Sequence, residues 1–295
     1  MDNKPYLSVI ITAKDLNDQK LKDLQFSLTQ QTYQDFETII VTEGDSENAK
    51  AIGLKKAKGD IIGIFASDNY LDDVNFLNKA MHCFQHPIHC AYPVRYSYVK
   101  YDNILNRYFA LIGGNDVIPL YLKRNDKFPY WINIPQNEGI VADVVDIFRV
   151  RTLGDNGFFV RKDILLQADI EHYYHIDVCQ DLFNLGYKKH ALIRTSIWHR
   201  TGGNFFKFFA KRFKYADKFN TPHRRWHMVE TRKDYANLLW FIFCTLTVIQ
   251  PLYLSVKGYR VIKDKAWFLH YPVCLMTLIV YTLWTLKRLI KNKKH

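Results

Sequence analysis

Acidic and hydroxyl side chains follow three short strand-like segments near the start of this 295-residue sequence. The segments are Leu7–Ile11, Glu37–Val41 and Ile61–Phe65, each as long as a single buried strand. A carboxylate can hold a divalent cation, and such a cation offsets the negative charge of a phosphate group. The side chains that follow the segments and could take part in such a site are Thr12, Asp15, Glu43, Ser67 and Asp68.

The elements between these segments should bring their ends together. Leu21, Leu24 and Leu28 recur at the three- and four-residue intervals of a helix, and a second helix is predicted over about residues 47–58. The order strand, helix, strand, helix, strand predicts a parallel sheet with right-handed crossovers. Ligands of such sheets bind beyond the carboxyl ends of the strands, which is where the acidic segments lie.

Composition limits the class of protein. A hydrophobic fraction of 48% permits a large buried core, and a formal net charge of +12 predicts an anionic partner. Nucleic acid, acidic lipid and phosphorylated substrates all fit the charge alone. Five cysteines without regular spacing disfavour a disulfide framework and favour a reducing, cytosol-facing location.

Two long apolar runs occupy the C-terminal quarter. Residues 236–256 and 266–286 each contain no charged side chain over 21 positions. That is the length of a helix that crosses about 30 Å of hydrocarbon, so two membrane-spanning helices are predicted. A shallow hairpin in one leaflet stays open as the alternative, because Gln250-Pro251 interrupts the first run and Pro272 the second.

A series of landmarks runs through the first strand-helix units. Ser8-Val9-Ile10-Ile11 opens the series, Gln31-Thr32-Tyr33 follows the first helix, and Gly59-Asp60 precedes a strand that ends in Ser67-Asp68-Asn69. Together they resemble the N-terminal half of the inverting GT-A glycosyltransferases of family 2, which include dolichyl-phosphate-mannose synthases and bacterial polysaccharide enzymes. The resemblance implies an α/β fold with a Rossmann-like, mainly parallel sheet, and transfer of a sugar from a nucleotide donor.

The resemblance also implies roles at the strand ends. Asp68 stands in the position of the family's Asp-x-Asp signature and would contact Mg²⁺ or Mn²⁺. Glu43 would hydrogen-bond the base or ribose, and Asp15 lies in the loop around the base. Thr12 and Ser67 belong to the same nucleotide-binding edge. A second interpretation of Asp68, as the N-cap of the next helix, stays open.

Two later segments resemble the parts of the family that hold the donor sugar and the acceptor. In the helix before Gly186-Tyr187, Asp177 stands where the family carries its catalytic base, and Asp181, one helical turn further, is the alternate. The segment Leu153–Lys162 resembles the Gly-rich stretch under the donor sugar, with a plain turn and strand as the other interpretation. Its candidate residues are Gly154, Asp155, Asn156, Gly157 and Arg161.

His199 follows a predicted strand, where many members of the family place a histidine that completes the metal site. A structural role for this histidine stays equally open. A basic and aromatic stretch precedes the first apolar run and suits the phosphates of a donor, a lipid or a membrane surface, with a solvated charged patch as the alternative. Its candidate residues are Arg212, Arg224, Arg225 and Trp226.

The sequence therefore predicts a membrane-anchored transferase. It would move a sugar from a UDP-, GDP- or dTDP-sugar to a lipid-linked or surface-glycan acceptor at the cell membrane, with its catalytic domain facing the cytoplasm. Nucleic acid is not an expected partner, since the apolar runs favour a membrane. A catalytically weak relative that acts as a binding or scaffolding subunit is the rival, because Ala66, Asn69 and Ile176 depart from the family's pattern.

The predicted parts are a GT-A domain over 1–220, a basic neck over 221–235, membrane helices over 236–256 and 266–286 joined by a basic connector over 257–265, and a basic tail over 287–295.

Overall fold

The computed structural model describes residues 5–134, 142–201, 203–217 and 223–292. The chain forms two compact units, of which unit 1 contains Met1–Ser97 and Ile134–Arg200, and unit 2 contains Tyr98–Asn133 and Thr201–His295. The division between the units therefore differs from the predicted domain limit at residue 220. It differs because residues 98–133 pack with the C-terminal helices.

Unit 1 is built on a mixed sheet. The strands are β1 (Leu7–Thr12), β2 (Phe36–Val41), β3 (Ile61–Ala66), β4 (Asn69–Tyr70), β5 (Cys90–Tyr96), β6 (Ala142–Asp146), β7 (Phe158–Arg161) and β8 (Lys189–His199). Among the described residues the strand order is β2-β1-β3-β7-β5-β8-β4, and β6 pairs with β8. Strands β1, β2, β3, β5 and β8 point the same way, and the shorter β4, β6 and β7 run opposite to them. The predicted α/β class with a mainly parallel sheet is confirmed.

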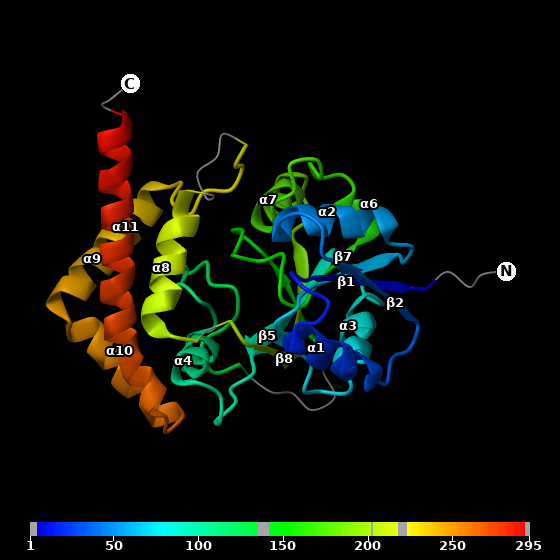
Figure 1. The fold of residues 1–295 in the computed structure, drawn as a ribbon, viewed down its shortest axis with the longest axis horizontal. Coiled ribbons are helices and arrows are strands. Elements are labelled where there is room, and N and C mark those ends of the chain that lie inside the picture. The colour runs from blue at the N-terminus through cyan, green and yellow to red at the C-terminus, as the bar shows by residue number, and fades with distance from the viewer. Residues whose placement is uncertain (1–4, 135–141, 202, 218–222, 293–295) are drawn as a thin grey trace. The chain divides into compact units, whose positions relative to one another are not determined.

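Helices cover both faces of this sheet. They are α1 (Gln19–Thr29), α2 (Ser46–Lys56), α3 (Phe76–Cys83), α6 (Lys162–Leu165) and α7 (His175–Asn184). Because β1 lies between β2 and β3, right-handed crossovers put α1 and α2 on opposite faces, and Figure 1 shows α1 with α3 on one face and α2 with α6 and α7 on the other. Asp18 caps α1 by accepting from the backbone N–H of Lys20, and Asp45 caps α2 in the same way.

The strand register brings several loops to one edge of the sheet. Thr12 at the end of β1 is paired with both Val41 of β2 and Ala66 of β3. At the end of β8, His199 is paired with Asn69 of β4. The backbone N–H of Gly157 donates to the carbonyl of Ile64 at 2.9 Å, so the loop before β7 lies at the carboxyl end of β3 as well. This edge is the place that the sequence predicted for a ligand.

Unit 2 is helical. Its elements are α4 (Ile104–Ile112), α5 (Ile118–Tyr121), α8 (Phe205–Tyr215), α9 (Arg232–Thr247), α10 (Ile249–Val261), the 3-10 helix η2 (Lys265–Leu269) and α11 (His270–Asn292). Tyr108 of α4, Phe241 of α9 and Trp267 of η2 are buried in its core. Gly258 of α10 makes room for the indole of Trp267, because a Cβ there would lie 2.3 Å from the ring.

The two predicted membrane helices have different shapes. Among the described residues, one helix, Lys265–Lys291, is long and apolar enough to cross a membrane. The run over 236–256 is instead broken, since Val248 adopts a left-handed φ of 65° and α9 and α10 meet at a bend of 86°. Pro251 explains the break, because its ring excludes the carbonyl four residues earlier and it has no N–H to donate. The helix predicted over 236–256 is therefore a pair of helices joined at a bend, and its crossing of a membrane stays a prediction.

Candidate active site

Asp68 and His199 meet at the carboxyl edge of the unit 1 sheet. Asp68 lies directly after β3, and the pairing of β4 with β8 brings His199 Nε2 to 3.4 Å from Asp68 Oδ1. Burial alone would raise the pKa of Asp68, but the facing His199 and the nearby Lys20 outweigh it and lower the pKa to about 2. Asp68 is therefore a carboxylate at neutral pH.

This pair has the donor atoms that a divalent cation needs. Oδ1 of Asp68 is shielded from solvent and accepts no hydrogen bond from the described residues, so it retains capacity for a ligand. Carboxylate oxygen suits Mg²⁺ and Mn²⁺, and imidazole nitrogen is a further ligand for transition metals. Within the described residues no group of three or more His, Cys, Asp or Glu side chains could hold a metal. Two protein ligands fit a cation that takes its other ligands from substrate phosphates and water.

Asn69 ties the Asp68 loop to the Gly-rich loop before β7. Its Oδ1 accepts from the backbone N–H of Ala66 at 3.0 Å, and its Nδ2 donates to Asn156 Oδ1 at 3.0 Å. Asn156, which has a left-handed φ of 54°, in turn donates to the hydroxyl of Tyr96 at 3.0 Å. The Tyr96 ring packs on His199 with centroids 5.2 Å apart. Asn69, which departs from the family pattern, thus links the two loops of the site.

Lys50 of α2 lies at the centre of a buried ion network. Its side chain is 1% exposed, and Nζ lies 3.2 Å from both Glu47 Oε1 and Asp155 Oδ2. Glu47 also accepts from the backbone N–H of His175 at 2.9 Å, and its Oε1 lies 2.8 Å from His175 Nδ1. The network therefore joins α2, the Gly-rich loop and the first turn of α7.

The charges in this network stabilise one another. Burial by itself would raise the pKa of Glu47, but the neighbouring His175 and Lys50 hold it well below its ordinary value. Burial would likewise lower the pKa of Lys50, whereas Asp155 and Glu47 raise it. Both groups are charged in the folded protein, and each depends on the other's charge.

Sequence reasoning missed Glu47, Lys50 and His175. One signal was present, because Lys50 falls on the buried stripe of α2 that also contains Ala49, Gly53 and Leu54. A lysine at a core position of an amphipathic helix requires a buried acidic partner. Glu47 lies three residues before Lys50, but Asp155 lies 105 residues after Lys50 and His175 lies 128 residues after Glu47, and nothing local identifies these two.

Asp177 lies in the first turn of α7 and is 1% exposed. The Gly-rich loop touches the same turn: Gly154 has a φ of 102°, and a Cβ on it would lie 2.4 Å from the carbonyl oxygen of His175. The alternate acid, Asp181, accepts a hydrogen bond from the backbone N–H of Asp169 at 3.2 Å. Asp181 thus holds the turn before α7, and the catalytic role of Asp177 stays a prediction.

Arg161 is not part of this edge. β7 runs antiparallel to β3, and the register pairs Arg161 with Ile61 at the amino end of β3. Its guanidinium donates to the carbonyls of Ile88 and Phe84 at 3.0 and 2.9 Å. The prediction that Arg161 lies at the donor sugar was wrong, because the direction of β7 carries the end of that segment away from the site.

The predicted nucleotide-binding residues follow the expected strand ends. The backbone N–H of Ser67 donates to the carbonyl of Thr12 at 3.0 Å, which joins the loops after β1 and β3. Asp15 is exposed, and its Oδ1 accepts from the backbone N–H of Asn17 at 2.9 Å in the turn before α1. Glu43 is exposed in the loop after β2. Their contacts with a nucleotide stay predictions.

The predicted phosphate-binding residues belong to unit 2. Arg212 of α8 forms an ion pair with Asp116, with Nη1 and Oδ2 3.3 Å apart. Arg224 and Trp226 are buried, and the guanidinium of Arg124 lies 5.7 Å from the centre of the Trp226 ring. Arg225 is half-buried. These contacts give Arg212 and Trp226 structural roles, and phosphate binding by the set stays a prediction.

Two solved structures align with most of the chain. The mannosyltransferase PcManGT from Pyrobaculum calidifontis, solved with GDP-Man and Mn²⁺, is 11% identical over 95% of this chain and 87% of that chain, with a TM-score of 0.47. S. aureus TarS 1-349, solved in complex with UDP-GlcNAc, is 13% identical over 93% of this chain and 89% of that chain, with a TM-score of 0.43. No protein-family model and no curated protein matches the sequence. Likenesses this distant do not place the chain in a family.

Proposed function

We propose that the chain is a glycosyltransferase that uses a nucleotide-sugar donor, with unit 1 as a GT-A catalytic unit. The observation that carries the proposal is the contact between Asp68 and His199 at the carboxyl edge of the parallel strands. This is the edge where open α/β sheets bind nucleotides. The Gly-rich loop borders it, and the buried carboxylate of Asp177 lies on the helix turn that the loop touches.

Each candidate residue has a part in the proposed reaction. Mg²⁺ or Mn²⁺ held by Asp68 and His199 would stabilise the negative charge of the departing diphosphate. Thr12, Asp15, Glu43 and Ser67 border the space for the base, ribose and phosphates of a UDP-, GDP- or dTDP-sugar. Asp177 would accept the proton of an acceptor hydroxyl, whose oxygen attacks the sugar opposite the leaving group and so inverts its configuration.

The proposed acceptor is a lipid-linked sugar or a surface glycan at the cell membrane. Helix Lys265–Lys291 supports attachment to the membrane. The proposed side of the membrane for unit 1 is the cytoplasm. The basic residues of unit 2, among them Arg225, suit anionic lipid headgroups or a lipid phosphate.

The test uses the full chain purified in detergent. A thermal-shift panel of UDP-, GDP-, dTDP- and CMP-sugars with and without Mn²⁺ identifies the donor, since a ligand of the native state raises the melting temperature. We expect a metal-dependent shift that Asp68→Ala abolishes. Asp177→Ala should keep the shift and lose sugar transfer, while Asp181→Ala serves as the control on the same helix. Undiminished transfer by both Asp68→Ala and Asp177→Ala would contradict the proposal.

A second candidate function is a binding subunit with little catalysis. It is favoured by Ala66 at the end of β3, where a carboxylate would give the cation another ligand. The same panel separates the two functions. A rise in melting temperature with the donor, without sugar transfer or donor hydrolysis whichever metal ion is added, would support the binding subunit.

A further inference from the structure

We infer that α9 and α10 form a wedge that enters one leaflet of a bilayer with anionic headgroups and leaves it on the side from which it came. The inference concerns the second part of the membrane attachment proposed above. It rests on that attachment and is independent of sugar transfer. In this proposal residues 236–256 belong to a re-entrant pair of helices and do not span the bilayer.

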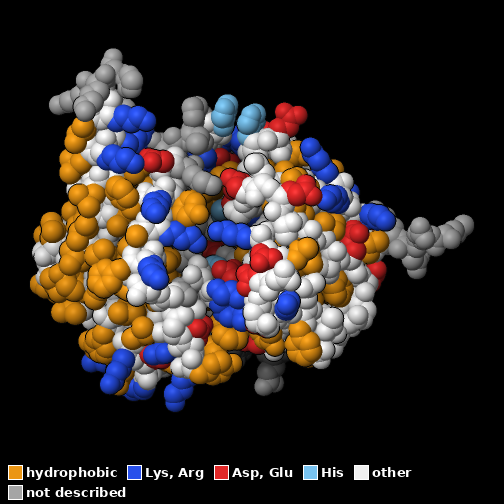
Figure 2. Space-filling view, viewed as in Figure 1, with side chains coloured by type: hydrophobic (Ala, Val, Ile, Leu, Met, Phe, Trp, Pro, Cys, Tyr) orange, Lys and Arg blue, Asp and Glu red, His pale blue; other side chains and the backbone are white. Residues whose placement is uncertain are grey.

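Apolar side chains gather on the outward face of the wedge beside its bend. Leu239, Phe243 and Leu246 of α9 are 66%, 55% and 67% exposed, and Ile249 of α10 is 76% exposed. The opposite face of each helix packs into unit 2, for example through Phe241, which is 1% exposed. Figure 2 shows hydrophobic side chains gathered over the part of the surface that α9 and α10 form in Figure 1. A soluble surface rarely exposes so many large apolar side chains together.

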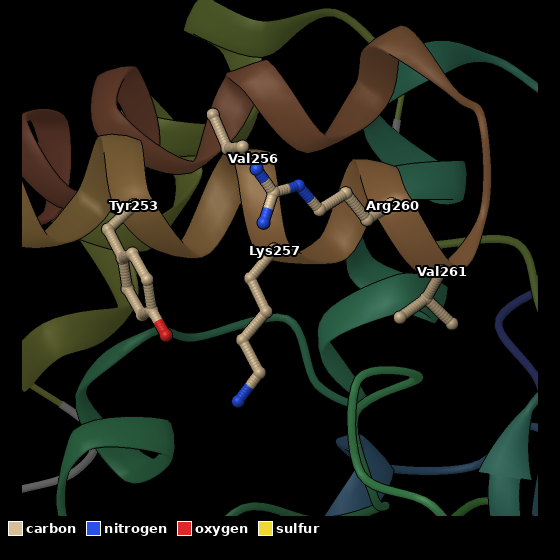
Figure 3. Close-up of a pocket in the computed structure, with 5 residues that line it drawn as sticks. All are labelled: Tyr253, Val256, Lys257, Arg260 and Val261. Atoms are coloured by element: carbon tan, nitrogen blue, oxygen red, sulfur yellow. The ribbon is translucent and has the colours of Figure 1, made fainter.

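Basic side chains occupy the ends of the wedge that are far from the bend. Arg232 and Lys233 begin α9, and Lys257 and Arg260 lie in the last two turns of α10. Figure 3 shows Lys257 and Arg260 with Tyr253, Val256 and Val261 around an open pocket of about 380 Å³ on α10. On both helices the sequence thus changes from apolar at the bend to cationic at the far end. The long apolar stems of Lys and Arg let their charged ends contact anionic headgroups while the apolar bend is inserted below the headgroups.

The dimensions fit one leaflet. At a rise of 1.5 Å per residue, about 12 Å of helix separate Ile249 from Lys257 and about 22 Å separate Arg232 from Thr247. Arms of these unequal lengths tilt unequally when their basic ends lie at one flat surface and the bend of 86° points into the bilayer. The bend then lies roughly 10 Å below the basic residues, which is less than half of the hydrocarbon core of ~30 Å. A wedge of this depth cannot reach the far leaflet.

Two features favour a bilayer over a protein partner. α11, which contains most of the candidate spanning helix, packs against both α9 and α10, so the wedge would lie beside a span. The basic residues also lie toward the far end of both helices, where an anionic surface around the inserted bend would contact them.

The test labels introduced cysteines in the full chain reconstituted in anionic liposomes. The five native cysteines are buried, so a membrane-impermeant maleimide reports on the introduced thiols. In the double variant Arg232→Cys/Lys263→Cys, a wedge gives molecules that carry two labels or none, because both ends lie on one side. A spanning arrangement gives molecules with one label, which the intact mass distinguishes, and this result would overturn the inference.

A single variant at the bend tests insertion. Leu246→Cys should lose its labelling in liposomes, whereas Phe26→Cys on α1 of unit 1, a residue of similar exposure at 59%, should keep it. Equal labelling at Leu246→Cys and Phe26→Cys would also overturn the inference and point to a protein partner. Sugar transfer measured on the same samples distinguishes failure of the wedge from failure of the proposed activity.

Discussion

Two acidic loops at the same edge of the unit 1 sheet are held in different ways. Asp155 in the Gly-rich loop is paired with Lys50, a buried lysine that Glu47 also contacts. Asp68 in the loop after β3 faces His199, and its Oδ1 accepts no hydrogen bond from the described residues. The difference indicates that Asp155 belongs to the framework that shapes the site, whereas Asp68 keeps an oxygen available for a ligand.

The physical basis of this difference is the cost of a buried charge. Removing one member of a buried ion pair leaves the other without compensation, and this is strongly destabilising. The side chains of Asp68 and Asp155 are about equally exposed, at 25% and 24%, so the difference lies in the partner left behind: Lys50 is 1% exposed and His199 is 11% exposed. Substitutions in the Lys50 network should therefore change stability, and substitutions at Asp68 should change ligand binding.

The largest effect is expected for Lys50→Met. The side chain keeps its approximate length but leaves the half-buried Asp155 without its cation and Glu47 with His175 alone, so the free energy of unfolding should fall by about 3–5 kcal/mol. Urea denaturation measures the change. Lys56→Met, at an exposed position of the same helix, is the control and should stay within about 0.5 kcal/mol. Equal stability of the two variants would show that the network contributes nothing.

Gly154→Ala should have the next largest effect. A Cβ there would lie 2.4 Å from the His175 carbonyl and would need the left-handed φ of 102°, so strain and overlap together should cost about 3 kcal/mol. Gly186 is a matched control, because its φ is 94° and nothing lies within 4 Å of its ideal Cβ. Gly186→Ala should cost about 1 kcal/mol from strain alone. Thermal denaturation compares them, and equal losses would mean that the loop does not contact α7.

Much of the framework of the site could be predicted from the sequence, because it depends on local patterns. Three strand-like segments gave β1, β2 and β3 within one or two residues, and the rule that ligands bind beyond parallel strands placed Asp68 at the correct edge. The position of His199 at the same edge was predicted from its place at the end of a strand-like segment. Asp155 and His175 could not be added to the Lys50 network in the same way, since only the folded chain brings them to Lys50 and Glu47.

Strand direction and helix continuity account for two differences between the predictions and the structure. The segment that ends in Arg161 has the pattern of a strand, but the pattern does not state whether the strand runs with β3 or against it. Antiparallel pairing moved Arg161 to the far end. The run over 236–256 has the composition of a membrane span, and although Pro251 marks an interruption in the sequence, the run alone does not give the bend of 86° between α9 and α10.

A smaller effect should appear in the pH dependence of stability. The pKa of Glu47 in the folded protein lies below its ordinary value of 4.5, so its contribution is present above that pH and is lost as the pH falls further. Stability of the wild type should therefore decrease between about pH 5 and about pH 3, with Glu47 supplying on the order of 1 kcal/mol of the decrease. Glu47→Gln should be less stable at neutral pH and show a shallower acid slope. An unchanged slope would mean that Glu47 is not held as a carboxylate by its partners.

The smallest effect on stability, and the sharpest form of the comparison, is expected for Asp68→Asn set against Asp155→Asn. The two substitutions are chemically identical and lie in loops that Asn69 and Asn156 join. Asp155→Asn removes one of the two acidic partners of Lys50, so the free energy of unfolding should fall by about 1–3 kcal/mol. Mn²⁺-dependent affinity for the donor should change only through displacement of the Gly-rich loop. Asp68→Asn should change stability by less than about 1 kcal/mol and weaken Mn²⁺-dependent donor binding by at least about tenfold, as loss of a metal ligand does. Calorimetric titration of the donor with and without Mn²⁺, beside urea denaturation, measures both quantities. If Asp155→Asn instead weakens Mn²⁺-dependent binding more than Asp68→Asn does, the cation lies at the Gly-rich loop and the roles of the two acids are exchanged.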